Sequence, residues 1–430
     1  MGGVALVCWS LMDRRSFLAL AGMPVLAMAD PLNAYAETYV KLVLAAGQHD
    51  PDYVDAYYGP AAWKESAARE ARPRAEIRSA AQALLERLTA TPAGAGPLLR
   101  LRHRYLLLQT RSLEQRLELL DGAKMSFDQE SQALYDAVAP ALPAGHFEPA
   151  LAALEKLIPG AAPLAERYEA WQKQFIIPAE KLDTVFRAAV DEARARTLRH
   201  IRLPPGESFT IEYVKGQVWS AYNWYKGNAH SLIQVNTDLP VEAGNAVSLA
   251  AHEGYPGHHV YNALLEDRLV RRRGWMEFTV YPLYSPQSLI AEGSAEHGVE
   301  LAFPAEERIA FYEQVLFPRA GLAPVRAREY QTVKDTVSKL AHAPNQAARD
   351  YLDGRIDRPA CQAYLTRYAL LPPARAAQRV RFIEKNRAYV INYNLGQDLV
   401  RSYLQRRGGD PWTEFEQLLS SPRLPSGLTS

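Results

Sequence analysis

Apolar residues recur at every third or fourth position over most of the first half of the chain, from Asn33 to about His200. Residues at this spacing lie on one face of an α-helix, so the pattern predicts a series of amphipathic helices. Proline and glycine residues separate the helical stretches, as they do in loops between helices. The clearest predicted helices are Ile77–Leu88, Leu98–Leu108, Leu113–Leu120 and Lys181–Ile201.

The pattern changes after Pro204-Pro205-Gly206, which we interpret as the boundary between a helical region of residues 30–203 and a second region of residues 204–430. Phe209–Val214 and Ser231–Val235 carry β-branched and aromatic residues at alternating positions, which predicts two strands. A helix is expected to begin near residues 242–245, and helical spacing then continues to the end of the chain. The predicted fold is therefore mainly α, with many helices and one small β-sheet.

The N-terminus has the layout of an export signal. Arg14 and Arg15 precede a short apolar segment that begins at Phe17 and ends in the small-x-small pattern Ala27-Met28-Ala29. This order resembles a bacterial twin-arginine signal, so we expect residues 1–29 to be a signal peptide, with Met12 as an alternative start. The 13 residues from Phe17 to Ala29 are fewer than the roughly 20 that a membrane span needs. A periplasmic or other extracytoplasmic protein with no integral span after signal removal is expected.

Composition excludes several classes of protein. Of the 430 residues, 48% are hydrophobic and 23% are charged, as in soluble globular proteins and unlike disordered or multi-span membrane proteins. The 49 basic and 48 acidic residues provide no bulk positive field, so no nucleic-acid partner is expected. Cys8 and Cys361 are the two cysteines, which rules out a disulfide framework. The sequence does not indicate an oligomeric state.

Candidate chemistry is concentrated between residues 252 and 297, which include four of the ten histidines. One segment reads His252-Glu253-Gly254-Tyr255-Pro256-Gly257-His258-His259, and the other reads Glu292-Gly293-Ser294-Ala295-Glu296-His297. Neutral imidazoles and one carboxylate are the ligands of a catalytic zinc ion, which keeps a fourth position for water. A carboxylate beside a ligand histidine, here Glu253, can accept a proton from that water.

The spacing of the histidines differs from the usual His-Glu-x-x-His pattern, which places two ligands at i and i+4 of one helix. Position i+4 from His252 is Pro256, while His258 and His259 stand at i+6 and i+7. On an unbroken helix, i+7 lies about 10.5 Å further along, which is a long reach for two ligands of one ion. Pro256 and Gly257 predict a break or bulge, which would let His258 replace the i+4 ligand. His259 is then a neighbour of the site or an alternative ligand.

The pattern His-Glu-x-x-Pro-Gly-His-His followed by Glu-Gly-x-Ala resembles a bacterial family catalogued as a domain of unknown function, whose members are regarded as zinc metallopeptidases of the gluzincin type. The resemblance covers roughly residues 170 to 425, and the first half matches only as helices. Ser294 stands where family members often carry Trp, a difference that concerns the pocket wall more than the metal. Further matching segments are Ile177–Ala179, Tyr222–Tyr225, Val235–Pro240 and Tyr393–Gln397.

This resemblance implies a gluzincin-like fold with the small β-sheet next to the active-site helix, and one Zn²⁺ per chain. His252, His258 and Glu292 are then the expected metal ligands, with Glu253 as the general base. Glu296 lies one helical turn after Glu292, where it is expected to orient a ligand histidine.

Other roles implied by the resemblance concern the surroundings of the metal. Ser231–Asn236 is expected to be the edge strand along which an extended peptide lies. Tyr393 is expected to donate to the developing oxyanion, with a simple packing role as the alternative. His297 is expected either beside the ligands or in solvent. Tyr222, Trp224 and Tyr225 are expected either to line a substrate pocket or to pack in the core.

The leading hypothesis is an exported zinc peptidase that hydrolyses peptide bonds with metal-activated water. One alternative is a zinc hydrolase that acts on a non-peptide ester or amide. Another is a non-catalytic protein that binds peptides or metal. Because Glu253 is present, the predicted catalytic set is complete.

Overall fold

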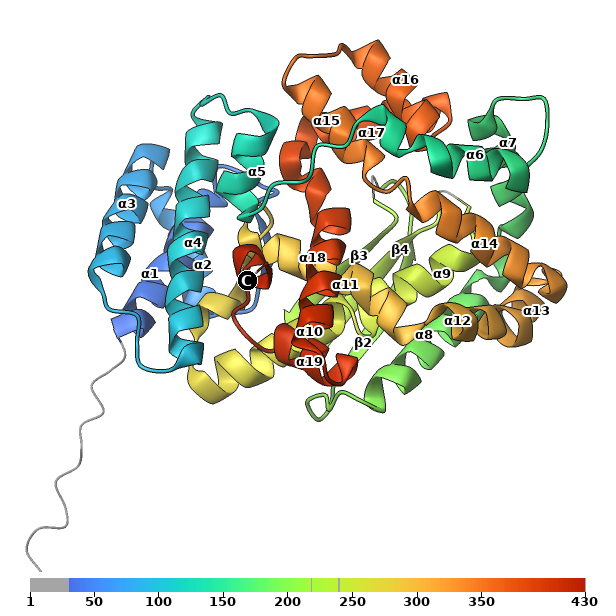
Figure 1. The fold of residues 1–430 in the computed structure, drawn as a ribbon. Helices are drawn as coiled ribbons and strands as arrows, with labels where there is room; N and C mark the ends of the chain where they lie inside the picture. Colours follow the sequence, from blue (N-terminus) through green and yellow to red (C-terminus); the bar gives the residue numbers. More distant parts are fainter. Residues whose placement is uncertain (1–30, 218, 239, 430) are drawn as a thin grey trace, which may run out of the picture.

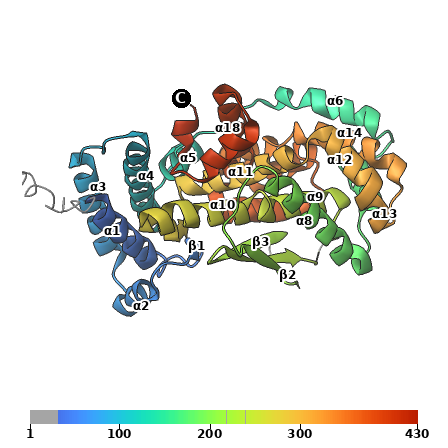
Figure 2. The ribbon, with the colours of Figure 1, turned by 90° about the horizontal axis from the view of Figure 1, so that it is seen from below.

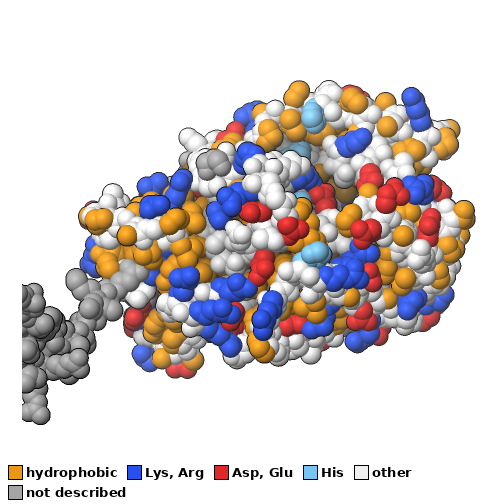
Figure 3. Space-filling view, turned by 60° about the horizontal axis from the view of Figure 1, so that its bottom comes forward, with side chains coloured by type: hydrophobic (Ala, Val, Ile, Leu, Met, Phe, Trp, Pro, Cys, Tyr) orange, Lys and Arg blue, Asp and Glu red, His pale blue; other side chains and the backbone are white. Residues whose placement is uncertain are grey.

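The computed structural model describes residues 31–217, 219–238 and 240–429. The signal peptide expected over residues 1–29 lies outside this part of the chain. Among the described residues, no helix combines the length and the hydrophobicity that a membrane crossing requires. On the face shown in Figure 3, Lys and Arg side chains are interspersed with Asp and Glu side chains, in line with the nearly equal numbers of basic and acidic residues in the sequence.

The fold is mainly α with small sheets, as the hydrophobic pattern predicts. The α-helices are α1 (Pro31–Ala46), α2 (Ala61–Glu70), α3 (Arg74–Ala90), α4 (Pro97–Leu120), α5 (Phe127–Tyr135), α6 (Glu148–Leu157), α7 (Leu164–Gln172), α8 (Leu182–Leu198), α9 (Ala243–Leu249), α10 (His258–Leu265), α11 (Pro286–Ala302), α12 (Ala305–Phe311), α13 (Phe317–Ala320), α14 (Ala327–Ser338), α15 (Ala343–Leu352), α16 (Arg358–Tyr368), α17 (Pro373–Asn386), α18 (Ile391–Arg407) and α19 (Pro411–Leu419). The strands are β1 (Val54–Tyr57), β2 (Ser208–Val214), β3 (Ala221–Gly227), β4 (His230–Asn236) and β5 (Val280–Pro282).

The larger sheet has the strand order β2-β4-β3, with β2 parallel and β3 antiparallel to β4. The expectation that Ser231–Asn236 forms an edge strand is therefore wrong, because β4 is hydrogen-bonded on both sides. The physical reason is that residues 221–227 form a further strand that covers the second edge of β4. The edges of this sheet are β2 and β3, and the sheet lies along one side of the molecule beneath α8, α9 and α10 (Figure 2).

A second sheet, which the sequence analysis does not predict, pairs β1 with β5 in antiparallel orientation. The pairing shifts register between Val54 and Ala56, so Asp55 occupies an irregularity in β1. This pairing joins the N-terminal helices to the segment just before α11, because β5 ends four residues before that helix begins.

The described residues form two large hydrophobic cores, and each draws on both sides of the boundary expected at residues 203 and 204. One core contains buried residues from α1, α3, α4 and α5 together with residues from α15, α17 and α18. The other contains α6, α7 and α8 together with α9, α10, α14 and α19. The N-terminal helices therefore pack directly on the C-terminal ones.

Helices α11 and α18 cross near the centre of the molecule (Figure 1). Gly293 and Gly396 meet at this crossing, where a Cβ atom on Gly293 would lie 2.2 Å from the carbonyl carbon of Gly396. Such a distance is far below van der Waals contact, so glycine is required for the two backbones to approach this closely. The crossing fixes the residues of α11 relative to those of α18.

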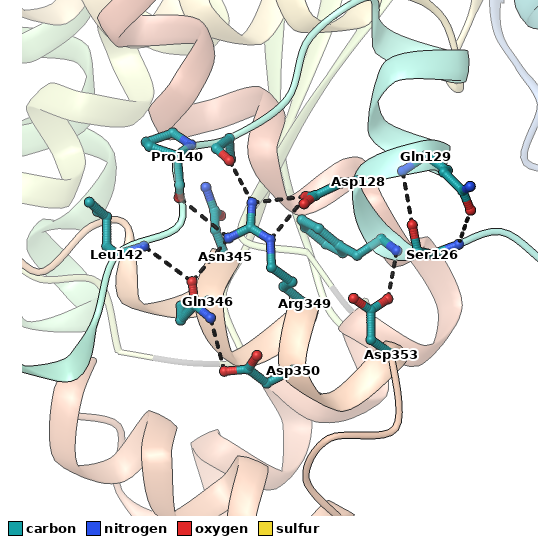
Figure 4. A network of polar contacts seen from close by, with 12 residues as sticks. Ser126, Asp128, Gln129, Pro140, Leu142, Asn345, Gln346, Arg349, Asp350 and Asp353 are labelled. Atoms are coloured by element: carbon teal, nitrogen blue, oxygen red, sulfur yellow. Dashed lines mark hydrogen bonds and ion pairs between the residues drawn. The ribbon is translucent and has the colours of Figure 1, made fainter.

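A polar network centred on Arg349 ties α15 to the N-terminal helices (Figure 4). The buried Arg349 guanidinium donates to the Asp128 carboxylate, 2.9 Å away, and to the carbonyl oxygens of Ala139 and Pro140. From the same helix, Asn345 exchanges amide hydrogen bonds of 2.7 and 3.2 Å with Asn394 on α18. This asparagine pair ties α15 to α18.

Candidate metal centre

The helix that carries His252 breaks at the place predicted from Pro256 and Gly257. α9 continues into a wider turn, η4 (Ala250–Gly254), in which Tyr255 N–H donates to the Ala250 carbonyl at 3.2 Å. Gly257 N–H then donates to the Ala251 carbonyl at 2.9 Å, and α10 begins at His258. A Cβ atom at position 257 would lie 1.8 Å from the His252 carbonyl oxygen, so glycine is needed for this turn.

Because of this turn, the His258 side chain lies beside that of His252, in the position that residue i+4 would occupy in a regular helix. The two imidazole rings lie edge to face with centroids 4.6 Å apart. Glu292 reaches the same place from α11, and its Oε2 atom lies 3.3 Å from His252 Nε2 and 3.7 Å from His258 Nε2. The three predicted ligands therefore converge, although they come from three different elements.

The convergent donors fit a metal ion. In a tetrahedral site with metal–ligand distances near 2.1 Å, neighbouring donor atoms lie about 3.4 Å apart. The observed separations match this value, and Glu292 Oε2 is buried without a hydrogen-bond partner among the described residues. A buried carboxylate oxygen without a partner is costly, and a cation would satisfy it. His252, His258 and Glu292 can therefore hold a metal ion.

Neighbouring side chains orient these ligands. Glu296 Oε1 lies 3.4 Å from His252 Nδ1, so it faces the ring nitrogen that the ligand group leaves free. The Tyr389 hydroxyl donates to Glu292 Oε1 at 2.8 Å, which leaves Oε2 for the metal. Such contacts fix the tautomer of a ligand histidine and the rotamer of a ligand carboxylate. The position expected for Glu296 is confirmed, whereas Tyr389 was not anticipated.

Protonation states also favour a cation at this place. Burial lowers the pKa of His258 to about 4, so its imidazole is neutral, as a metal ligand must be. Burial also acts to lower the pKa of His252, but the Glu292 and Glu296 carboxylates outweigh it and raise that pKa well above its ordinary value. The carboxylates therefore stabilise positive charge at the meeting point of the ligands, as a proton on His252 when no metal is bound, and a metal ion would displace that proton when His252 becomes a ligand.

Glu253 is the acid next to this group. It is 6% exposed, and burial raises its pKa to about 7, with repulsion from Glu292 and Glu296 adding to the effect and His252 opposing it. The Asn223 side chain on β3 donates to the Glu253 backbone carbonyl at 2.6 Å, which ties this turn to the sheet. A cation bound nearby would favour the ionised carboxylate, which is the form that accepts a proton.

Tyr393 lies in the first turn of α18, four residues after Tyr389, which belongs to the short helix before α18. The centroids of the two rings are 5.8 Å apart. Burial raises the pKa of Tyr393 well above its ordinary value, and Glu292 and Glu253 raise it further. Its phenol is therefore protonated and can act as a hydrogen-bond donor near both site carboxylates. The side chain remains partly accessible, so it is not sealed in the core.

His259 does not join the metal ligands. Its Nδ1 lies 2.9 Å from Ser231 Oγ and its Nε2 lies 3.0 Å from Glu207 Oε2, so both ring nitrogens have partners. The residue is fully buried and far from solvent. Glu207 also accepts hydrogen bonds from Tyr255 and Arg194. The alternative of His259 as a ligand is thereby corrected: this histidine anchors the first turn of α10 to β4 and to the loop before β2.

Other candidates from the sequence lie outside the ligand group. His297 contacts Glu300 at 3.4 Å and packs against Phe415. Tyr225 is buried in a small separate hydrophobic cluster, and its hydroxyl donates to Glu266, so it packs inside the protein and does not line a pocket. Tyr222 and Trp224 alternate along β3 with Asn223, which faces η4, so these two aromatic residues lie on the opposite face of the sheet.

Asp55 on β1 is an acid near the site that the sequence analysis missed. Burial raises its pKa to about 8, and the next largest causes are the charges of Glu292 and Glu253. Nothing in the local sequence distinguishes Asp55 from other acids of the N-terminal half, because the pairing of β1 with β5 is what brings it here. Tyr389 could have been found as the residue one turn before Tyr393 on the same helical face.

Comparison with known proteins provides a likeness of fold. No family model matches the chain, and no curated protein matches it. Among solved structures, a "putative lipoprotein" from Colwellia psychrerythraea aligns with a TM-score of 0.50 and 15% identity, over 82% of this chain and 65% of that protein. A "putative lipoprotein of unknown function" from Shewanella oneidensis aligns with a TM-score of 0.48 and 11% identity, over 85% of this chain and 74% of that one. The chain thus spans about two thirds of the Colwellia protein and shares its overall fold.

Proposed function

We propose that this chain is an exported zinc-dependent peptidase. The observation that carries the proposal is the convergence of His252, His258 and Glu292, with Glu253 directly beside them. Two neutral imidazoles and one carboxylate are the ligand set of catalytic zinc in several hydrolases, and three ligands leave a position for water. A carboxylate adjacent to a ligand is the usual proton acceptor in such sites.

A zinc ion held there would acidify water and polarise a substrate carbonyl group. Glu253 would take a proton from the attacking water and pass it to the departing amine. The protonated hydroxyl of Tyr393 would donate a hydrogen bond to the carbonyl oxygen as it gains negative charge. Glu296 and Tyr389 would hold His252 and Glu292 in their binding orientations.

An extended substrate would lie along β3. This strand is an edge of the sheet, whereas β4 is paired on both sides. Asn223 from β3 is hydrogen-bonded to the Glu253 backbone, so a peptide paired with β3 would run close to the proposed base. The proposed location outside the cytoplasm is supported by the twin-arginine pattern at Arg14 and Arg15 and by the name of the Colwellia protein as a lipoprotein.

Substitution of Glu253 by Gln tests the proposed chemistry. The amide cannot accept a proton, so turnover should fall by a factor of at least about 10³ while zinc binding persists, because Glu253 is not a ligand. Hydrolysis of a quenched fluorescent peptide library and of an ester panel would be followed beside zinc content. Normal peptide turnover by Glu253→Gln would contradict the mechanism, and cleavage of esters alone by the wild type would favour the non-peptide alternative.

A further inference from the structure

Arg379 on α17 carries a charge that has no acidic partner among the described residues. Burial lowers the pKa of its guanidinium, yet the side chain remains partly accessible. Among the interactions found in the described part of the chain, the guanidinium has neither an ion pair nor a hydrogen bond, and its contact is the ring of Phe382, 5.2 Å away.

Three shielded arginines elsewhere in this protein are paired with acids. Arg102 lies 2.6 Å from Glu277, Arg116 lies 2.6 Å from Asp50, and Arg349 donates to Asp128. This is the normal arrangement, because a shielded charge without a counter-charge is expensive. Arg381, two residues further along α17, also lacks a partner in the part of the chain that the structure describes, but its side chain is exposed to solvent. Arg379 therefore differs from both groups.

The position of Arg379 connects it to the metal site. The Phe382 ring that it contacts packs against Tyr389, with centroids 6.5 Å apart, and Tyr389 donates to Glu292. The positive charge of Arg379 acts to lower the pKa of the Tyr393 phenol, against the larger effect of burial, so the guanidinium lies on the same side of the protein as Tyr393. The guanidinium is thus connected to Glu292 through the side chains of Phe382 and Tyr389, on the side of the metal site formed by α17 and α18.

We propose that Arg379 binds a carboxylate of the substrate, so that the site takes peptides with a carboxylate close to the scissile bond. This inference rests on the proposed function and deepens it. A guanidinium matches a carboxylate with two parallel hydrogen bonds and remains charged at every physiological pH. The carboxylate is either the C-terminal group of the peptide or an acidic side chain, and both present the same chemistry to Arg379.

Three synthetic peptides distinguish these sources: N-acetyl-tetra-alanine with a free C-terminus, the same peptide as a C-terminal amide, and the amide with Glu at its last position. The zinc-loaded wild type should cleave at least one carboxylate peptide with a kcat/KM at least tenfold above that of the plain amide. Arg379→Met should abolish this preference through KM, and Arg379→Lys should retain part of it because the charge remains. The control Arg381→Met should keep the wild-type ratio. Equal kcat/KM for all three peptides in the wild type would overturn the inference and leave the peptidase proposal standing.

If no peptide is cleaved, measurements of peptide binding test the role of Arg379 separately from the proposed peptidase activity. Calorimetry with zinc-loaded Glu253→Gln should show at least tenfold tighter binding of a carboxylate peptide than of the plain amide, and Glu253→Gln/Arg379→Met should lose this difference. That result without wild-type turnover would sustain the role of Arg379 and refute the peptidase proposal. Binding that does not distinguish carboxylate from amide, or that keeps the distinction without Arg379, would refute the inference.

Discussion

Two adjacent histidines, His258 and His259, differ in what their imidazoles contact. His258 opens α10, where its ring meets that of His252 and its Nε2 lies 3.7 Å from Glu292 Oε2. His259 points the other way, where Ser231 and Glu207 occupy both of its nitrogens. A metal ion on His259 would have to replace one of these buried hydrogen bonds, at a cost of about 1–3 kcal/mol.

Glu296 is predicted to strengthen metal binding without contacting the metal. Glu296→Ala removes the carboxylate that faces His252 Nδ1, so zinc affinity should fall by roughly 10- to 100-fold. Competition with a chromophoric chelator measures this change. Glu300→Ala is the matched control, because Glu300 lies one turn further along α11 and pairs with Arg401 at 2.7 Å. Equal affinities for Glu296→Ala and the wild type would show that this contact does not orient the ligand.

At the scale of elements, the position of Glu292 depends on the crossing of α11 with α18. Gly293 follows this ligand directly and touches Gly396, while α18 supplies Tyr393 and follows η9 (Arg387–Val390), which supplies Tyr389. A change in the crossing would therefore move the ligand relative to the tyrosine that fixes it. The turn after η4 is held against α11, because Pro256 packs against Gly298 of that helix.

Gly293→Ala should disturb both stability and the metal site. The new methyl group would overlap the Gly396 backbone, which cannot rotate away as a side chain can, so a loss of about 3 kcal/mol or more in the free energy of unfolding is expected. Urea denaturation measures the change in the free energy of unfolding, and competition with a chelator measures the change in zinc affinity. Gly145→Ala is the control, since a Cβ atom there meets nothing within 4 Å. Similar stabilities of the two variants would argue against a tight crossing.

The sequence predicted those helices and strands whose residue pattern is decided by neighbours a few positions apart. The strands near 209–214 and 231–235 and the helix break at Pro256-Gly257 were predicted, because alternation and proline chemistry act within a few residues. β3 was not predicted, since its aromatic residues also fit a pocket wall. β1 has only four residues, and its partner β5 is distant in sequence, so no local pattern reveals the pairing.

The residues of the metal site also divide into those that a local motif reveals and those that only the fold brings together. His252, Glu253, His258, Glu292 and Glu296 belong to two short motifs and were found from the sequence. Asp55 and Tyr389 come near the metal ligands only through packing of the N-terminal and C-terminal helices, and the same packing connects Arg379 to Tyr389 through Phe382. The role of His259 needed the fold as well, because Ser231 and Glu207 become its neighbours only when β4 and the loop before β2 meet α10.

At the scale of the whole molecule, Glu207 connects α8, α10 and the turn after η4 through Arg194, His259 and Tyr255. Burial acts to raise its pKa, but these three hydrogen bonds outweigh burial and lower the pKa from 4.5 to about 2. A lowered pKa in the folded state means that the ionised carboxylate stabilises the fold. This contribution is complete above about pH 4.5 and is lost as the pH falls towards 2.

Acid unfolding should therefore depend on Glu207. Wild-type protein without metal should be more stable than Glu207→Gln at pH 6, and the difference in the free energy of unfolding should shrink between about pH 4.5 and 2. Urea denaturation at several pH values measures it. Glu306→Gln removes an exposed pair with Arg328 and should change stability little at any pH. A difference between Glu207→Gln and the wild type that does not vary with pH would contradict this role.

The most direct test of the account is the zinc content of the purified protein, measured by elemental analysis for the wild type, His258→Ala and His259→Gln. About one zinc per chain is expected in the wild type, with loss in His258→Ala and retention in His259→Gln, whose amide preserves part of the buried network. Circular dichroism confirms that each variant is folded. A wild type that binds no metal after zinc is added, or zinc that is lost with His259 and kept without His258, would contradict the proposed centre.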